Sequence, residues 1–164
     1  MQTFESILKR SSVREYLDKE IPIELLENLV NAGRSAPSAR ALEPWEFVVV
    51  TNKEKLAKLG DICDHGKFIK NAATCIIILS QDTKYFLEDG CAACENILLA
   101  AADMNLGACW VAGDKKDYRD EVLRLVKAPP GLKLVSLISL GWPKREIIQK
   151  KNRKLEEVIH WENY

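Results

Sequence analysis

The order of apolar and polar residues along the chain predicts several short amphipathic helices. Apolar residues three and four positions apart predict one helix that begins at Thr3 and a second that begins at Pro22. A third helix is expected after Asn52, because asparagine often caps a helix N-terminus, and a later helix is expected to be capped by Asp114. Each carries its apolar residues on one side, so each is expected to pack against a core.

Further apolar runs have the composition of strands. Residues 45–50 and 74–79 are rich in Val and Ile, and the second run shows no alternation, as expected of a strand covered on both faces. Residues 107–113 and 132–142 predict two more strands. Residues 85–105, which precede the third strand, form a long and almost wholly apolar helix, typical of a central or interface helix.

Composition and charge narrow the class of protein. No repeat or Gly/Ser/Pro-rich linker divides the chain, so residues 1–164 are expected to form one domain. The 24 Lys and Arg residues balance the 24 Asp and Glu residues, which argues against nucleic acid or an anionic membrane surface as a partner. No apolar run approaches the roughly 20 residues that span a bilayer. The N-terminus lacks a secretory signal, and the odd number of cysteines fits no disulfide scaffold, so we expect reduced thiols in the cytoplasm.

Several familiar catalytic arrangements are missing from the sequence. The glycines form neither a dinucleotide-binding fingerprint nor a phosphate-binding loop. His65 and His160 are too few for a histidine zinc site or a catalytic triad, and both are expected at the surface. Cys91 and Cys94 form a C-x-x-C within the predicted apolar helix, where they can pack as small hydrophobes, form a redox pair or supply half of a metal site.

Two basic clusters lie at opposite ends of the chain. The first spans Arg10–Arg14 and includes two serines, and the second spans Lys150–Lys154. Guanidinium and hydroxyl groups in one turn are suited to binding a phosphate, because arginine offers several donors and serine completes the shell. Either cluster alone is also compatible with a solvated surface.

Taken in order, several segments resemble the FMN-dependent nitroreductase family. The resemblance covers nearly the whole chain and is carried by Leu8–Tyr16, Ile21–Pro22, Ala36–Ala39, Pro44–Val49, Asn105–Trp110, Leu140–Pro143 and Lys151–Val158. It implies an α+β fold with a mixed or antiparallel central sheet flanked by helices. It also implies a homodimer with FMN at the subunit interface.

The resemblance assigns the two basic clusters to the FMN phosphate. In the first cluster the implied ligands are Arg10, Ser11, Ser12 and Arg14. In the second they are Lys151 and Arg153, which the family brings to the same phosphate. Several cationic donors are needed there, because the phosphate loses water when it binds.

Other segments are implied to contact the flavin ring. Pro37, Ser38 and Ala39 would approach the ring from the second subunit, and Lys67 would supply a polar ring contact. The strand end would direct backbone N–H groups at the flavin N5 and O4, which makes ring contacts of Trp110, Val111, Ala112 and Gly113. Donors at that place would stabilise the charge that develops as the ring is reduced.

The implied activity is an NAD(P)H-dependent flavin oxidoreductase. NADH or NADPH would deliver a hydride to FMN, and a small acceptor such as a nitroaromatic or a quinone would then take the electrons by a ping-pong scheme. The chain itself would supply no catalytic acid, base or nucleophile and no metal. Alternatives are a flavin store or sensor without efficient turnover, a flavoenzyme fed by a protein electron donor, and a thiol or metal protein built on Cys91 and Cys94.

The sequence also departs from the family pattern. Ala41 and Glu43 replace two amide residues of the family's Asn-x-Gln-Pro-Trp segment, so an anionic side chain is expected near the pocket. Only a few residues separate the second strand from the long helix, where many relatives insert helices that cover the substrate. We therefore expect an open flavin face.

Overall fold

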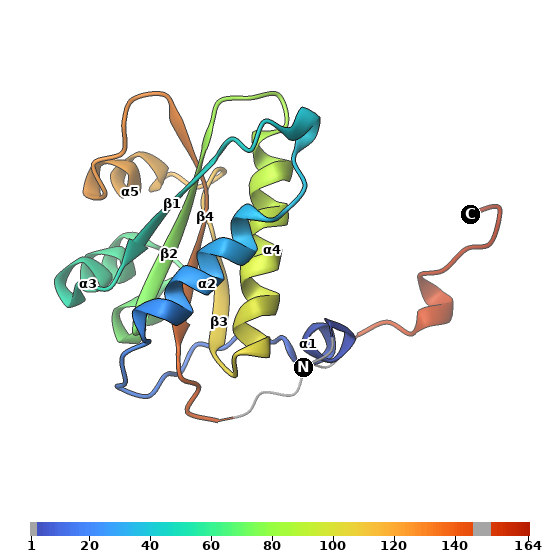
Figure 1. Cartoon of the computed structure of the whole chain (residues 1–164), viewed down its shortest axis with the longest axis horizontal. Helices are drawn as coiled ribbons and strands as arrows, with labels where there is room; N and C mark the ends of the chain where they lie inside the picture. The colour runs from blue at the N-terminus through green and yellow to red at the C-terminus, as the bar shows by residue number, and fades with distance from the viewer. Residues whose placement is uncertain (1–2, 146–151) are drawn as a thin grey trace.

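The computed structural model describes residues 3–145 and 152–164 (Figure 1). Within those residues, helices and strands alternate in much the order that the sequence predicts. The helices are α1 (Thr3–Lys9), α2 (Ile23–Arg34), α3 (Lys53–Ile62), α4 (Phe86–Asp103) and α5 (Arg119–Leu125), with short 3₁₀ helices η1 (Ala39–Ala41), η2 (Lys67–Asn71) and η3 (Leu155–Glu157). The strands are β1 (Trp45–Val50), β2 (Thr74–Gln81), β3 (Gly107–Ala112) and β4 (Leu132–Gly141).

The strands form one antiparallel sheet in the order β1-β2-β4-β3. The expected mixed or antiparallel sheet is thus antiparallel throughout the described residues. β2 and β4 are the central strands, and helices cover both of their faces, which explains why residues 74–79 show no alternation. β1 and β3 form the two edges of the sheet.

The helices form a layer on each face of the sheet (Figure 1). On one face, α2 and α4 cover the side chains of Ile76 and Ile138. On the other face, α3 and α5 cover Ile77 and Leu137. Neighbouring residues of one strand thus belong to different apolar clusters, because successive side chains of a strand point to opposite faces.

The two expected caps have different outcomes. The Asn52 side chain accepts a hydrogen bond from the Lys55 N–H at 3.0 Å, which confirms the cap of α3. The expectation that Asp114 caps a helix is wrong, because α5 begins only at Arg119. Instead, the Lys116 N–H bonds to the Gly113 carbonyl at 3.1 Å and starts a tight turn ahead of α5.

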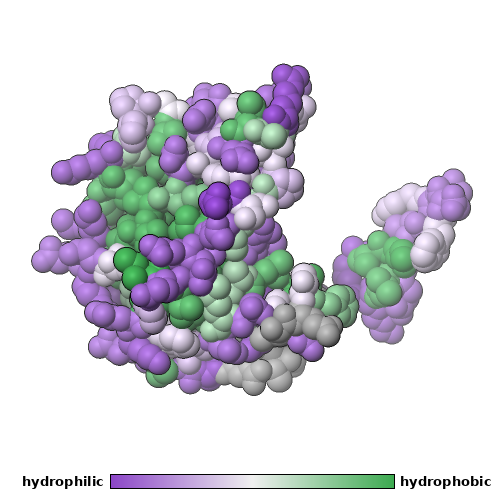
Figure 2. Space-filling model, in the orientation of Figure 1, coloured by the Kyte–Doolittle hydropathy of each residue, from purple (hydrophilic) through white to green (hydrophobic). Residues whose placement is uncertain are grey.

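Two segments outside the sheet layers bear on the site. After α1 the chain runs along the open side of β3, where Ser12 forms a parallel bridge with Ala108. Residues 152–164 form a tail that stands apart from the remainder in Figure 1, with Leu155 71% and Trp161 78% exposed. Figure 2 shows apolar atoms on the tail. Among the described helices, none combines the length and apolar character that a membrane crossing requires.

Candidate functional site

The first basic cluster lies against the beginning of β3. Arg10 is half-buried just after α1, and Ser12 and Arg14 are exposed. The Ser12 hydroxyl contacts the Cys109 thiol, and the positive charges of Arg14 and Arg10 favour a lower pKa for that thiol. Burial is nevertheless the larger effect, and it raises the pKa of Cys109. These groups lie near the start of β3, but Arg10 and Ser11 line one cavity and Arg14 lines another. Their assignment to one phosphate stays a prediction.

A cavity of about 460 Å³ opens beside this cluster. Its lining is Lys9, Arg10, Ser11, Val13, Leu98, Ala102, Asn105, Leu106, Gly107, Ala108, Pro143, Lys144 and Arg145. Four of these described lining residues are Lys or Arg, and none is Asp or Glu. A hydrogen bond from Lys9 Nζ to Asn105 Oδ1, at 2.5 Å, orients the Lys9 side chain. The chain has zero net charge, but the lining of this cavity is basic. Two of its cations have carboxylate partners outside the lining, since Arg10 lies 3.9 Å from Glu95 and Arg145 lies 2.8 Å from Glu15. Lys9 and Lys144 add positive charge that suits an anion.

β3 is an edge strand, so alternate residues direct their backbone N–H and C=O groups away from the sheet. The Ala108 carbonyl faces outward, because it accepts a hydrogen bond from the Val13 N–H at 2.9 Å. The Ala112 carbonyl also faces outward and accepts from the Tyr118 hydroxyl at 2.5 Å. The N–H groups of Trp110 and Ala112 share this outward direction and find no acceptor among the described residues. The edge therefore offers two backbone donors to a ligand.

The 3₁₀ helix η2 lies beside the same edge. Gly66 packs so closely on Val111 that an added Cβ would lie 3.2 Å from Val111 Cγ1, which brings the neighbouring Lys67 toward β3. Lys67 Nζ donates to the Asp61 carbonyl at 2.7 Å. The Arg14 guanidinium lies 5.7 Å from the centre of the Phe68 ring. Arg14 thus contacts the 3₁₀ helix that contains Lys67, while the Lys67 amine is bonded to α3. The assignment of Lys67 as a ring contact stays a prediction.

The loop that contains Pro37, Ser38 and Ala39 lies at the other end of α4. The Ala39 N–H donates to Asp89 Oδ1 at 2.9 Å, in the first turns of α4, whereas Lys9 contacts Asn105 just beyond its last turn. The 18 residues of α4 span roughly 27 Å at 1.5 Å per residue. Arg10 reaches part of the way back along the helix, because its Nε lies 3.9 Å from Glu95 Oε1, six residues or roughly 9 Å of helix rise from Asp89. The loop and the cavity beside Arg10 thus lie toward opposite ends of α4.

The backbone of this loop is strained. Arg40, Ala41 and Glu43 have φ values of 56°, 52° and 48°, a left-handed conformation that costs non-glycine residues about 1–2 kcal/mol each. Two side chains hold it: Asp89 through the bond from the Ala39 N–H, and Ser38, whose Oγ accepts from the Glu43 N–H at 2.9 Å. The Ala41 N–H also donates to the Ser38 carbonyl at 3.1 Å. Strain of this kind is characteristic of functional loops.

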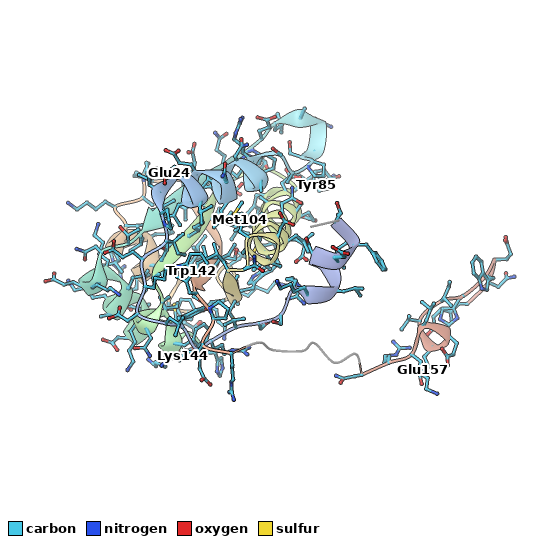
Figure 3. The ribbon with its side chains drawn as sticks, turned by 60° about the horizontal axis from the view of Figure 1, so that its bottom comes forward. Glu24, Tyr85, Met104, Trp142, Lys144 and Glu157 are labelled. Carbon is cyan, nitrogen blue, oxygen red and sulfur yellow. The ribbon has the colours of Figure 1, made fainter. Side chains whose placement is uncertain are left out.

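The second basic cluster is not brought to the first in this chain. Arg153 lies on the tail, and its guanidinium donates to the Glu157 carbonyl. Lys151 falls outside the described residues. Figure 3 shows Glu157 on the tail, well separated from Lys144. The assignment of Lys151 and Arg153 to the phosphate stays a prediction.

The comparisons with known proteins decide the family. A family model described as "Putative TM nitroreductase" matches residues 2–164.

The chain belongs to this nitroreductase family.

Relatives and solved structures agree with that family. A "Putative NADH dehydrogenase/NAD(P)H nitroreductase" of Methanothermobacter thermautotrophicus is 36% identical over 149 residues, covering 87% of this chain and 78% of the relative. A crystal structure with the same description, from Bacteroides thetaiotaomicron, has a TM-score of 0.93 at 33% identity and covers 99% and 98% of the two chains. An FMN-dependent nitroreductase of Clostridium difficile has a TM-score of 0.91 at 30% identity and covers 98% and 99%. The nitroreductase-like α+β fold is therefore established.

Sequence reasoning missed four residues around the nitroreductase site. Lys144 and Arg145 line the cationic cavity, and their position directly after the last strand was an available signal. Asp89 holds the strained loop, and an acid among the apolar residues of 85–105 could have drawn attention to it. Tyr118 had no signal, because its contact with Ala112 depends on the turn that replaces the expected helix start.

The cysteines of this nitroreductase lie in environments that suppress thiol chemistry. Burial raises the pKa of all five thiols, and that of Cys63 to about 11. A thiol that stays protonated is a weak nucleophile and a weak metal ligand. Among the described residues, no group of three or more His, Cys, Asp and Glu side chains is placed to hold a metal. The structure therefore favours the packing interpretation of Cys91 and Cys94.

The native thiols should react slowly with iodoacetamide. A raised pKa leaves less thiolate at pH 7, so labelling is expected to be at least about tenfold slower than for free cysteine, and to accelerate as pH rises toward 9. Cys91, which is only partly buried, should react first. Mass spectrometry of the labelled chain provides the count, with urea-unfolded protein as the control in which every cysteine reacts. Fast labelling of both Cys91 and Cys94 at pH 7 would contradict this assignment.

Proposed function

We propose that this chain is an FMN-dependent NAD(P)H oxidoreductase that reduces nitroaromatics, quinones or similarly electron-poor acceptors. The observation that carries the proposal is the basic cavity at Arg10 and Ser11 beside the edge of β3, where the Trp110 and Ala112 N–H groups have no acceptor in the described part of the chain. An anionic group and a polar ring are the two parts of FMN that such a surface would bind. The similarity to the FMN-dependent nitroreductase of Clostridium difficile supports this cofactor.

The cationic cluster would hold the phosphate. Arg10, Ser11, Ser12 and Arg14 surround the start of β3 and supply charged and hydroxyl donors. Charge-assisted hydrogen bonds of this kind contribute about 1.5–3 kcal/mol each. Lys151 and Arg153 are proposed as further phosphate ligands that the tail would deliver, either to its own chain or to a second copy.

The edge of β3 would orient the ring. The Trp110 and Ala112 N–H groups would donate to ring acceptors, and Val111, Gly113 and Lys67 would complete the contact surface. When bound, FMN supplies the redox chemistry, taking a hydride from NADH or NADPH and passing electrons to the acceptor. The chain binds and orients these groups. No acid, base or nucleophile is assigned to it.

We further propose that the outer face of the site is open, because only residues 82–85 connect β2 to α4. In the proposed dimer, the exposed Glu43 carboxylate of the second copy would disfavour anionic acceptors there, because its loop would be the one that approaches the flavin. A flavin-bound structure in which other elements enclose the ring would contradict this openness. We also propose a cytoplasmic location, which suits a chain whose cysteines are all free in the structure.

Arg10→Ala should weaken FMN binding by about 10- to 100-fold, because one charged phosphate contact is lost. The measurement is fluorescence titration of FMN, together with the flavin absorbance of the purified protein. The matched control is Lys58→Ala, which removes an exposed cation on α3 and should leave the affinity unchanged. Purified Arg10→Ala protein that is as yellow as wild type would refute the phosphate assignment. Colourless wild type that also fails to bind added FMN would refute the cofactor.

Alternating use of one site predicts parallel double-reciprocal lines when NAD(P)H and acceptor are varied together. Stopped-flow reduction by NADH and by NADPH separates an enzyme from a flavin store, because a store would be reduced slowly. Intersecting lines would contradict the ping-pong scheme. Flavin reduction that is too slow to support turnover would favour a flavin store over an enzyme.

We propose that the working form is a homodimer. In one chain the loop at Pro37–Ala39 binds Asp89 at the start of α4, whereas the cavity beside Arg10 is lined by Leu98 and Ala102 toward the other end of that helix. We propose that a second copy supplies the loop to the flavin. α1 exposes Phe4 by 69% and Leu8 by 59%, and the tail exposes further apolar side chains. Exposed apolar groups that lie together are characteristic of an interface.

The double variant Phe4→Asp/Leu8→Asp should therefore raise the dimer dissociation constant at least about 100-fold, because burying two such side chains contributes roughly 3–6 kcal/mol. Sedimentation velocity over a concentration series measures it. The control is Lys55→Asp/Lys58→Asp on α3, which changes surface charge on the opposite face of the sheet and should leave the association intact. A monomeric wild-type protein at all concentrations would overturn the homodimer.

A further inference from the structure

Ala112 is the last residue of β3, and Tyr118 holds it from outside the sheet. The Tyr118 hydroxyl donates to the Ala112 carbonyl at 2.5 Å, across the turn that leads into α5. On this edge Val13 bonds to Ala108 near the start of β3, but no strand of the described residues pairs with the outer edge at Ala112. The last residue of β3 is therefore paired through β4 alone. The last residue of an edge strand frays readily when nothing else holds it. Tyr118 supplies the missing constraint.

The direction of the Ala112 N–H depends on this contact. In an extended residue, the N–H and the C=O point to the same side of the strand. Holding the carbonyl toward Tyr118 therefore keeps the N–H on the same outer edge, where it has no acceptor in the described chain. Gly113 permits the arrangement, because an added Cβ there would lie 2.7 Å from the Val135 carbonyl oxygen.

Tyr118 is itself rigidly placed. Its side chain is buried, with 7% exposure, and packs in the cluster that contains Val122 and Leu134. Its hydroxyl also contacts the Cys63 thiol. Burial raises the pKa of Tyr118, so the hydroxyl stays protonated and remains a donor at physiological pH. A fixed ring with a permanent donor is a suitable anchor for a backbone carbonyl.

We propose that Tyr118 is a positioning residue for the flavin: its hydroxyl holds the Ala112 carbonyl so that the Ala112 N–H stays directed at the ring. This inference rests on the FMN site proposed above. It concerns a residue that touches neither cofactor nor substrate and that acts through the backbone of Ala112. A displacement of a donor by about 1 Å can cost up to 100-fold in rate, so a tether of this kind is sufficient to affect turnover.

The test variant is Tyr118→Phe, which keeps the packed ring and removes only the hydroxyl. The rate of flavin reduction in stopped flow is expected to fall about tenfold, while the FMN dissociation constant changes less than about threefold, because the phosphate ligands are untouched. The visible and near-ultraviolet bands of bound FMN, which respond to hydrogen bonding at N5 and O4, should shift. In the FMN-free protein, amide hydrogen exchange of residues 111–113 should accelerate.

The matched control is Cys63→Ala, which removes the other contact of the Tyr118 hydroxyl and leaves its bond to Ala112. This variant should retain the wild-type flavin spectrum, the reduction rate and the exchange of residues 111–113, even if its melting temperature falls. Equal losses in both variants would show a general effect of the core and would overturn the inference. So would Tyr118→Phe protein with wild-type exchange, spectrum and rate. A wild-type protein that binds no FMN would refute the proposed function, and this inference with it, before any variant is compared.

Discussion

The outer edge of β3 imposes the constraint on which the site depends. An edge strand exposes a row of backbone polar groups, and each needs a partner. Different groups bind the carbonyls of this row: the Val13 N–H donates to Ala108, and the Tyr118 hydroxyl donates to Ala112. Within residues 3–145 and 152–164, the N–H groups of Trp110 and Ala112 remain without acceptors, beside a basic cavity. An unpaired strand edge usually promotes aggregation, but the unpaired donors of this edge are also suited to binding a polar ligand.

Local features of the sequence accounted for most of the elements. The β-branched runs at 45–50 and 74–79 are strands, and Asn52 caps its helix, because these properties depend on neighbouring residues alone. The prediction for Asp114 was wrong although it also rested on residue type. Aspartate is a common helix cap, but here the Lys116 N–H bonds to the Gly113 carbonyl in a tight turn, and α5 begins only at Arg119. Whether such a segment forms a turn or a helix start depends on backbone geometry, which the residue types alone do not determine.

The site was predictable only where the family resemblance supplied the long-range pairing. The grouping of Arg10 and Ser12 with β3 requires a bridge between residues 96 positions apart, which no local pattern encodes. Asp89 and Tyr118 both bind backbone groups, and residue type does not identify which backbone group a side chain binds. An acid in an apolar segment draws attention to Asp89, but not to its partner. The loop at Pro37 and the tail at Arg153 show a further limit, because neither belongs to the described lining of the cavity beside Arg10, although the resemblance assigns all three to one flavin.

The cationic cavity in a neutral chain has a consequence for how a ligand arrives. With zero net charge, the molecule as a whole exerts little long-range attraction, and the field of the cavity is confined to its surroundings. At physiological ionic strength, screening shortens its reach to about 8 Å. An anionic ligand therefore meets the surface by unassisted diffusion and is recognised only at the mouth of the cavity. Capture is local, and its strength is set by ionic strength more than by the charge of the rest of the protein.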